Sequence, residues 1–234
     1  ELGITNNIFL CTHVWQCHGY DNGLPEVWPP DPAFGTAEDM KSLARTCREH
    51  GWGFGVHHNV VDFYTNAACF TWNEIARDWR NEPVRAWRNV FRGVQSWRMA
   101  PHVAPGIMRR SLGEMNAAGF SPDLLFVDVI GSFPARPYFD QDGNGYVPAA
   151  ARQFIGEVFD TIREVQNRTT GRETFTASEA AHDYLIGHLD GGDCQFMEVT
   201  RETGEYCWNV IPQYDDMEKI PWFDAVNHSV FSLH

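Results

Sequence analysis

The feature that most constrains the fold of this sequence is a continuous apolar run, Leu124 to Ile130 (LLFVDVI), broken only by Asp128. A strand with one wet face alternates apolar and polar residues, whereas a strand buried on both faces is apolar throughout. Strands of the second kind belong mainly to parallel sheets, in which helices return the chain between strands. The run therefore predicts an α/β fold built on a parallel sheet.

The rest of the chain alternates between strand and helix patterns. Strands are expected over 7–15, 52–61, 124–130 and 174–178, with weaker candidates at 95–99, 195–199 and 225–230. The expected helices open at Thr36, with Asp39 as its capping-box partner, at a segment carrying Leu112 and Met115, and at Pro148, and they end at Gly51, Gly119 and Gly171. A strand, a helix and a second strand joined by short connections predict a right-handed parallel crossover.

Six or seven such units without a glycine-rich dinucleotide loop favour a (β/α)8 TIM-type barrel over a doubly wound sheet. A barrel of this type usually takes about 250 residues, so we expect part of one unit to lie outside this chain. The chain does not begin with Met and stops directly after an apolar run, which predicts further domains of a longer polypeptide. No boundary divides 1–234, so we expect one domain, with the Trp- and Arg-rich stretch 66–105 as an insertion.

The charge balance excludes several classes of partner. The 18 basic and 31 acidic residues give a formal net charge of −13, which repels nucleic acid and anionic lipid. No apolar run reaches the roughly 18–20 residues that span a bilayer. The six cysteines include no CxxC pair of the kind that binds zinc. We therefore expect neither a nucleic acid nor a membrane partner.

Two carboxylates stand where neighbouring predicted strands end. Asp128 interrupts the most apolar strand, where a lone carboxylate is costly unless it faces a polar cavity or has partners. Glu179 stands where the next strand gives way to a loop. Active sites of parallel barrels are built at the carboxyl ends of the strands. Glycoside hydrolysis needs such a pair, one carboxylate as nucleophile and one protonated acid for the leaving oxygen.

Further polar and aromatic residues near the strand ends are candidates for binding a sugar. They are His13, Trp15, His57, His58, Asn59, Asp62, Asp183, Asp190 and His228. His13 and Trp15 alternate along the first strand, so we expect both to point to the barrel mouth, with Trp15 lining the sugar subsite. The alternative is that Trp15 fills the barrel core.

Four stretches carry a resemblance to a known family of enzymes. They are the segment from HVWQCHGYDNGLPEVW to FGVHHNVVDFY, LLFVDVIGSFPARPYFD, TASEAAHDYLIGHLDGGD and IPWFDAVNHSVFSLH. Together they resemble the catalytic barrel of the endo-α-N-acetylgalactosaminidases and their relatives in glycoside hydrolase families 101 and 129. The resemblance implies that Asp128 acts as nucleophile and Glu179 as acid/base.

Two other arrangements of residues compete for a chemical role. Asp140, Asp142 and Asn144 match the first half of a calcium-binding EF-hand loop, but Ala151 stands where the bidentate Glu belongs, so an Asp/Gly-rich turn is the alternative to structural Ca²⁺. His57 and His58 with Asp62 and Asp128 could begin a metal-dependent hydrolase site. Adjacent residues of a strand point to opposite faces, however, so these two histidines cannot share one ion without distortion.

The residues and the resemblance together predict a retaining glycoside hydrolase. Its substrate would be an α-linked sugar of the galactose or N-acetylgalactosamine type in a carbohydrate or glycoconjugate, cleaved by double displacement without a cofactor. The alternative function is a barrel that binds carbohydrate without cleaving it, or a fragment of a larger glycosidase.

Overall fold

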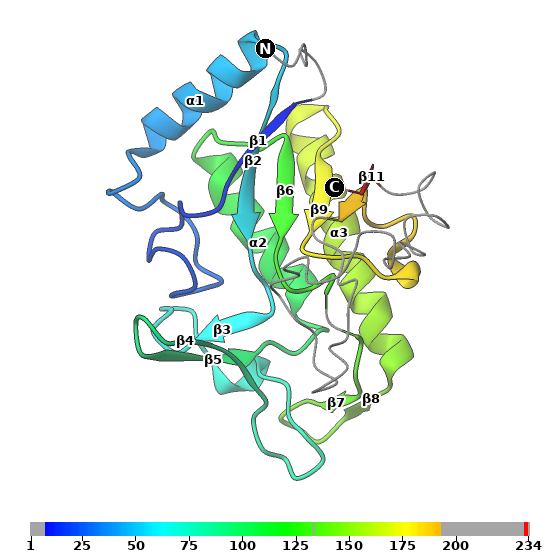
Figure 1. The fold of residues 1–234 in the computed structure, drawn as a ribbon. Coiled ribbons are helices and arrows are strands. Elements are labelled where there is room, and N and C mark those ends of the chain that lie inside the picture. Colours follow the sequence, from blue (N-terminus) through cyan, green and yellow to red (C-terminus); the bar gives the residue numbers. More distant parts are fainter. Residues whose placement is uncertain (1–7, 133, 193–231, 234) are drawn as a thin grey trace, which may run out of the picture.

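A parallel sheet forms the centre of the protein in a computed structural model that describes residues 8–132, 134–192 and 232–233 (Figure 1). Its strands are β1 (Phe9–Thr12), β2 (Gly53–His58), β6 (Leu124–Val127), β9 (Phe175–Ser178), β10 (Gly191–Gly192) and β11 (Ser232–Leu233), and they lie side by side in that order. Every neighbouring pair runs parallel. The predicted α/β fold with a parallel sheet is therefore confirmed.

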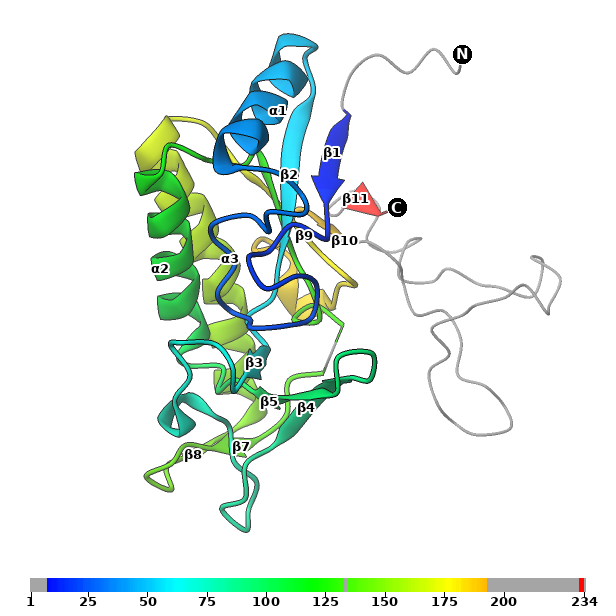
Figure 2. The same cartoon turned by 90° about the vertical axis from the view of Figure 1, so that its left-hand side faces the viewer.

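Three helices connect the first four strands, and all three lie on the same face of the sheet (Figure 2). They are α1 (Ala37–Glu49), α2 (Ala104–Ala117) and α3 (Pro148–Thr170). The Thr36–Asp39 capping box opens α1, and α3 ends at Gly171 with a φ of +66°. A doubly wound sheet carries helices on both faces, so this one-sided arrangement with sequential strand order is typical of a barrel wall. Closure into a barrel stays a prediction.

Both faces of the sheet are apolar, which explains the unbroken run in β6. Leu125 and Val127 belong to the main core, which the sheet forms with the helices. Leu124 and Phe126 point the other way and pack with Ala177 in a second cluster on the helix-free face. No helix among the described residues is long and apolar enough to cross a membrane.

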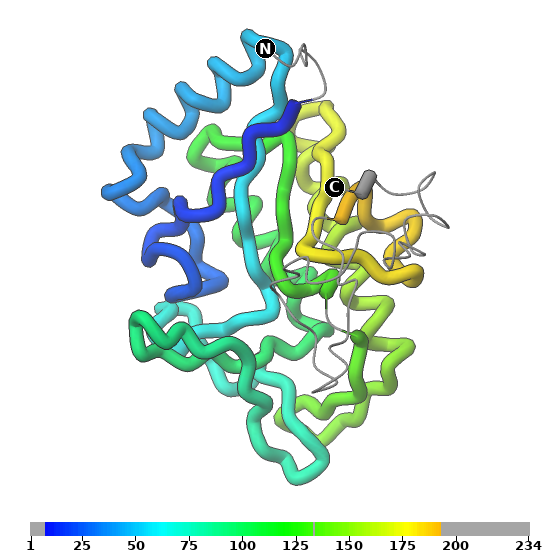
Figure 3. Tube along the Cα trace, in the orientation of Figure 1, coloured from blue at the N-terminus to red at the C-terminus, as the bar shows by residue number. Residues whose placement is uncertain are grey.

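The connections at the carboxyl ends of the strands are long, whereas those at the amino ends are short (Figure 3). The connection from β2 to α2 holds a three-stranded antiparallel sheet of β3 (Asp62–Tyr64), β5 (Val94–Arg98) and β4 (Arg85–Asn89), together with the short helix η1 (Trp72–Glu74). The connection from β6 to α3 holds the hairpin of β7 (Tyr138–Phe139) and β8 (Gly145–Tyr146). The short helix η2 (Asp183–Leu185) follows β9.

One predicted strand belongs to a different sheet from the one expected. The segment 95–99 does form a strand, β5, but it pairs antiparallel with β3 and β4 and is no part of the parallel sheet. Its hydrogen-bond partners, β3 and β4, come from the same connection, and the short turn between β4 and β5 allows that pair only an antiparallel arrangement. The candidates at 195–199 and 225–230 lie outside the described residues.

Candidate active site

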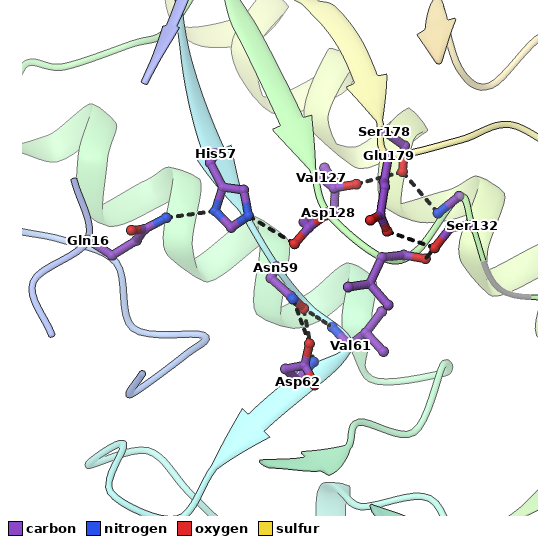
Figure 4. Close-up of polar contacts among 12 residues, drawn as sticks. Gln16, His57, Asn59, Val61, Asp62, Val127, Asp128, Ser132, Ser178 and Glu179 are labelled. Atoms are coloured by element: carbon purple, nitrogen blue, oxygen red, sulfur yellow. Dashed lines mark hydrogen bonds and ion pairs between the residues drawn. The ribbon is translucent and has the colours of Figure 1, made fainter. Parts of the chain in front are cut away.

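Asp128 and Glu179 follow neighbouring strands at the carboxyl edge of the sheet (Figure 4). β6 and β9 pair with Val127 opposite Ser178, so the residue after each strand reaches the same level. Asp128 also extends the ladder towards β2, donating its backbone N–H to the carbonyl of His58 at 2.8 Å. The sheet therefore places both carboxylates on the edge where parallel α/β proteins bind their ligands.

The loops that carry the two carboxylates are tied to each other by serine hydroxyls. Ser178 Oγ donates to the carbonyl of Val127 at 2.6 Å and accepts the Gly131 N–H at 2.9 Å. From the other loop, Ser132 Oγ lies 2.9 Å from Glu179 Oε2. Each loop thus holds a residue of the other, which fixes their relative position.

The turn directly after Asp128 is strained and tightly packed. Val129 has a φ of +67°, which a β-branched residue rarely adopts. Its carbonyl is the acceptor for the Ser132 N–H at 2.9 Å. A Cβ added at Gly131 would lie 2.2 Å from the Ala180 carbonyl oxygen of the adjacent loop, so only glycine fits. Strain that the surroundings hold in place is common at functional sites.

His57 is fully buried and connects Asp128 to Gln16 (Figure 4). Gln16 Oε1 accepts the Trp15 N–H, so the amide nitrogen of Gln16, 2.6 Å from His57 Nδ1, must donate to the imidazole. A neutral imidazole that accepts at Nδ1 carries its proton on Nε2. That Nε2 lies 3.2 Å from Asp128 Oδ2, in an electrostatic contact rather than a well-aligned hydrogen bond.

Tyr20 and Asp21, in the loop after β1, complete this part of the site. The Tyr20 ring lies 5.2 Å from that of His57 between centroids. Burial raises the pKa of Tyr20, and the charges of Asp128, Asp21 and Glu179 raise it further. Burial, followed by the charges of Asp62 and Asp128, raises the pKa of Asp21 to about 6. Asp21 has a φ of +51°.

Asn59 and Asp62, predicted to bind substrate, are instead buried and held by protein donors. Asn59 Nδ2 donates to Asp62 Oδ2 at 2.7 Å. Asp62 Oδ1 accepts the Ser96 hydroxyl at 2.6 Å and the Trp87 N–H at 3.0 Å. Burial raises the pKa of Asp62. With 2% of its surface exposed, Asp62 anchors the β4–β5 hairpin beside the site rather than contacting a ligand.

The predictions for Trp15 and His58 are also wrong. β1 ends at Thr12, so the alternation that would have grouped Trp15 with His13 does not continue. Trp15 is fully buried in the core, where its Nε1 donates to the carbonyl of His57 at 2.8 Å. His58 points to the helix face and meets Ser111 Oγ of α2 at 2.7 Å.

The other predicted sugar-binding residues are spread widely. His13 lies beside the site, with its ring 5.3 Å from that of His57. Asp183 is exposed on η2, in the loop that follows Glu179. Asp190 lies at the opposite, amino-terminal edge, where its carboxylate accepts from Arg163 and from the Thr176 N–H, so its assignment is wrong. His228 lies outside the described residues.

The calcium candidate forms a hydrogen-bonded turn between β7 and β8. Asp140 Oδ1 accepts the backbone N–H groups of Asp142 and Asn144, each at 2.9 Å. The Asn144 side chain donates to Asp140 Oδ2 and lowers the pKa of this carboxyl. Across the part of the chain that the structure describes, no three His, Cys, Asp or Glu side chains are grouped to hold a metal ion, and His57 and His58 face opposite sides of the sheet.

Solved structures of carbohydrate-active enzymes share this fold. The α-N-acetylgalactosaminidase NagBb from Bifidobacterium bifidum, as its GalNAc complex, is 23% identical with a TM-score of 0.69, over 79% of this chain and 28% of that chain. TtGalA, an α-galactosidase from Thermus thermophilus in complex with p-nitrophenyl α-D-galactopyranoside, is 19% identical with a TM-score of 0.50, over 79% and 34%. A Paenibacillus sp. cycloisomaltooligosaccharide glucanotransferase is 9% identical with a TM-score of 0.52, over 68% and 24%.

These similarities define the class of fold: an α/β parallel sheet of the kind found in enzymes that act on glycosidic bonds. The chain spans less than a third of the length of NagBb. Neither the protein family models nor the curated proteins include a match to this sequence.

Sequence reasoning missed several residues that surround Asp128. Tyr20 and Asp21 lie in the Gly- and Pro-rich loop that follows the first strand. Loops at the carboxyl ends of barrel strands supply site residues, so this position was the available signal. Gln16 and Trp87 gave no such signal, because their roles depend on contacts between distant segments.

Proposed function

We propose that the protein is a retaining glycoside hydrolase that cleaves an α-linked sugar of the galactose or N-acetylgalactosamine type. The observation that supports this best is the placement of Asp128 and Glu179 after register-matched neighbouring strands, on the carboxyl edge of this fold. The sugar class follows from the ligands named for two similar structures, GalNAc for NagBb and an α-galactoside for TtGalA.

In this proposal Asp128 is the nucleophile. Its carboxylate attacks the anomeric carbon as the bond to the leaving oxygen breaks, giving a covalent glycosyl ester. The His57 Nε2–H faces Asp128 Oδ2, so the other carboxylate oxygen stays available for the sugar. Water then attacks the anomeric carbon, and the ester bond breaks to regenerate Asp128 with the sugar's original configuration.

Glu179 is the acid/base in the same proposal, so it must begin the cycle protonated. Ser132 has a single hydroxyl proton, yet its Oγ lies 2.8 Å from the Val129 carbonyl and 2.9 Å from Glu179 Oε2. When Ser132 donates to Val129, a protonated Glu179 completes the second bond by donating to Ser132. Glu179 gives this proton to the leaving oxygen and later takes one from the attacking water.

Two variants separate these roles. Asp128→Asn should lower kcat by about 10³-fold or more on every α-galactoside and α-N-acetylgalactosaminide, because no covalent ester can form. Glu179→Ala should lower kcat/KM by about 10²-fold or more for alkyl glycosides but much less for p-nitrophenyl glycosides, whose leaving group needs no proton. Glu114→Gln, on the exposed side of α2, is the control for removing an acidic charge.

The stereochemistry of the first product tests the retaining mechanism directly. NMR of the newly released sugar should show the α-anomer before it equilibrates in water. Release of the β-anomer would contradict the double displacement, and sugar binding without turnover would instead favour a carbohydrate-binding barrel.

A further inference from the structure

Trp87 on the β4–β5 hairpin has a fixed backbone and an open side chain. Its N–H donates to Asp62 Oδ1 at 3.0 Å, and its carbonyl accepts from Gln95 Nε2 at 3.1 Å and lies 2.8 Å from Ser96 Oγ. The residue is nevertheless 55% exposed. The protein thus holds a large aromatic ring at the surface in one defined place.

That place is at the rim of the proposed active site. The Trp87 side chain lies beside the carboxylate of Asp21 and lowers its pKa slightly against the larger effect of burial. Asn89, from the same hairpin, donates its Nδ2 to the Asp21 carbonyl at 3.1 Å. The preceding residue, Tyr20, contacts the His57 ring and lies under the electrostatic influence of Asp128 and Glu179. In Figure 1 the hairpin lies beyond the carboxyl end of β2, on the same side as these loops.

The burial of these groups increases towards Asp128. His57 is fully buried and Tyr20 is partly buried, whereas Trp87 is more than half exposed. A sugar whose anomeric carbon meets Asp128, whose side chain is 14% exposed, would lie at the level of the partly buried Tyr20. The part of a substrate beyond the scissile bond would extend outwards, to the level of Trp87. Indole faces are flat and apolar and favour stacking against rings.

We propose that Trp87 is the platform on which a ring-shaped leaving group of the substrate stacks, with Asp21, which the same hairpin contacts through Asn89, as the positioning residue beside the indole. This inference rests on the proposed glycosidase function and adds to it a preference for α-glycosides whose leaving group is a sugar or aryl ring. An alkyl leaving group such as methyl has no face to stack and gains nothing from Trp87.

The same connection supplies a matched control. Trp79 is 74% exposed, and the Arg80 guanidinium lies 4.4 Å from its ring centroid. It lies in the turn 78–82, in which Asp78 Oδ1 accepts the backbone N–H groups of Arg80 and Glu82. Arg77, just before this turn, donates its N–H to the Phe139 carbonyl of β7, so Trp79→Ala removes an equally large exposed indole on the side of the β7–β8 hairpin.

The experiment compares KM and kcat of the purified protein and its variants on p-nitrophenyl and methyl α-glycosides of the same sugar. Trp87→Ala should raise KM for the p-nitrophenyl glycoside roughly tenfold and change its kcat less than about threefold, because stacking contributes to ground state and transition state alike. KM for the methyl glycoside should stay the same. Trp87→Phe should restore most of the loss, Asp21→Ala should show part of it, and Trp79→Ala should match wild type.

Each other result decides against the inference in a distinct way. Equal changes in KM for both glycosides, or equal effects of Trp87→Ala and Trp79→Ala, would show that Trp87 is no leaving-group platform. If the Trp87→Ala variant does not fold, Trp87→Phe and Trp87→Leu replace it in the same comparison, because Phe offers a flat ring and Leu does not. Failure of the wild-type protein to hydrolyse either glycoside would overturn the proposed function itself.

Discussion

Gln16 sets which nitrogen of His57 carries the proton that faces Asp128. Gln16→Glu places an acceptor where the amide donates at 2.6 Å, so His57 Nδ1 must take a proton. A neutral imidazole then turns a lone pair towards Asp128, which disfavours the ionised form of this proposed nucleophile. We expect kcat/KM to fall roughly tenfold or more, because the Asp128 carboxylate loses its orientation. The ¹⁵N chemical shifts of His57 should show the proton on Nδ1 in the variant and on Nε2 in wild type. Unchanged shifts would contradict the assigned tautomer.

The ionised Asp21 carboxylate lowers the stability of the folded protein above about pH 6. Its pKa is about 6 in the folded state against an ordinary value of 3.8, so the folded state binds the proton more tightly than the unfolded chain does. Stability therefore falls as pH rises from about 4 to about 6. Asp21→Asn should raise the free energy of unfolding by about 1–2 kcal/mol at pH 8, after allowing for solvent screening, and by only a small part of that at pH 4. Asn also tolerates the φ of +51°. Thermal unfolding at both pH values tests this, and an equal gain at pH 4 would show that charge is not the cause.

At the scale of helices and strands, the features that can be predicted from the sequence are those that short-range interactions determine. The capping box at Thr36 and the glycine at 171 mark their helix ends because caps act within a few residues. Strand direction depends on distant partners, so the segment 95–99 could be recognised as a strand but not placed in its sheet. Trp15 was misplaced because alternation predicts a side chain's direction only while the strand lasts, and β1 ends three residues earlier. The positions of Asp128 and Glu179 at the ends of neighbouring strands could be predicted, because apolar runs show where strands end.

The packing of β2 against α2 should weaken in acid through His58. Burial, followed by the neighbouring His57, lowers the pKa of His58 to about 3, whereas the unfolded value is near 6.5. The unfolded chain therefore takes up the proton first, and stability falls as pH drops from about 6.5 towards 3. His58→Gln keeps a hydrogen-bond partner for Ser111 but does not titrate. Between pH 6.5 and 5.5 its free energy of unfolding should therefore fall by about 1 kcal/mol less than that of wild type. Chemical denaturation across this range is the measurement, with His50→Gln at the exposed end of α1 as control. A slope equal to that of wild type would exclude His58 as the titrating group.

For the whole molecule, the decisive question is whether the sheet closes into a barrel. Ile8 directs its carbonyl to Gly53, so the next residue, Phe9, points its N–H away from β2, towards the outer edge of β1. In a closed (β/α)8 barrel a further strand accepts that N–H, and we expect its hydrogen exchange to be slowed roughly 10³-fold or more. The Phe91 amide, beside a fully exposed side chain, serves as the fast-exchanging reference. Exchange of Phe9 as fast as that of Phe91 would indicate an open sheet.

The interlocked serines and the glycine between them bear on how such a protein could be re-engineered. Gly131 leaves no room for a side chain against Ala180, while Ser178 and Ser132 each bond across the gap between the two loops. Residues 127–132 and 178–181 therefore form one structural unit rather than two. Grafting either loop alone from another protein would lose the contacts that the other loop makes with it, so both loops have to be exchanged together if the spacing of Asp128 and Glu179 is to be kept.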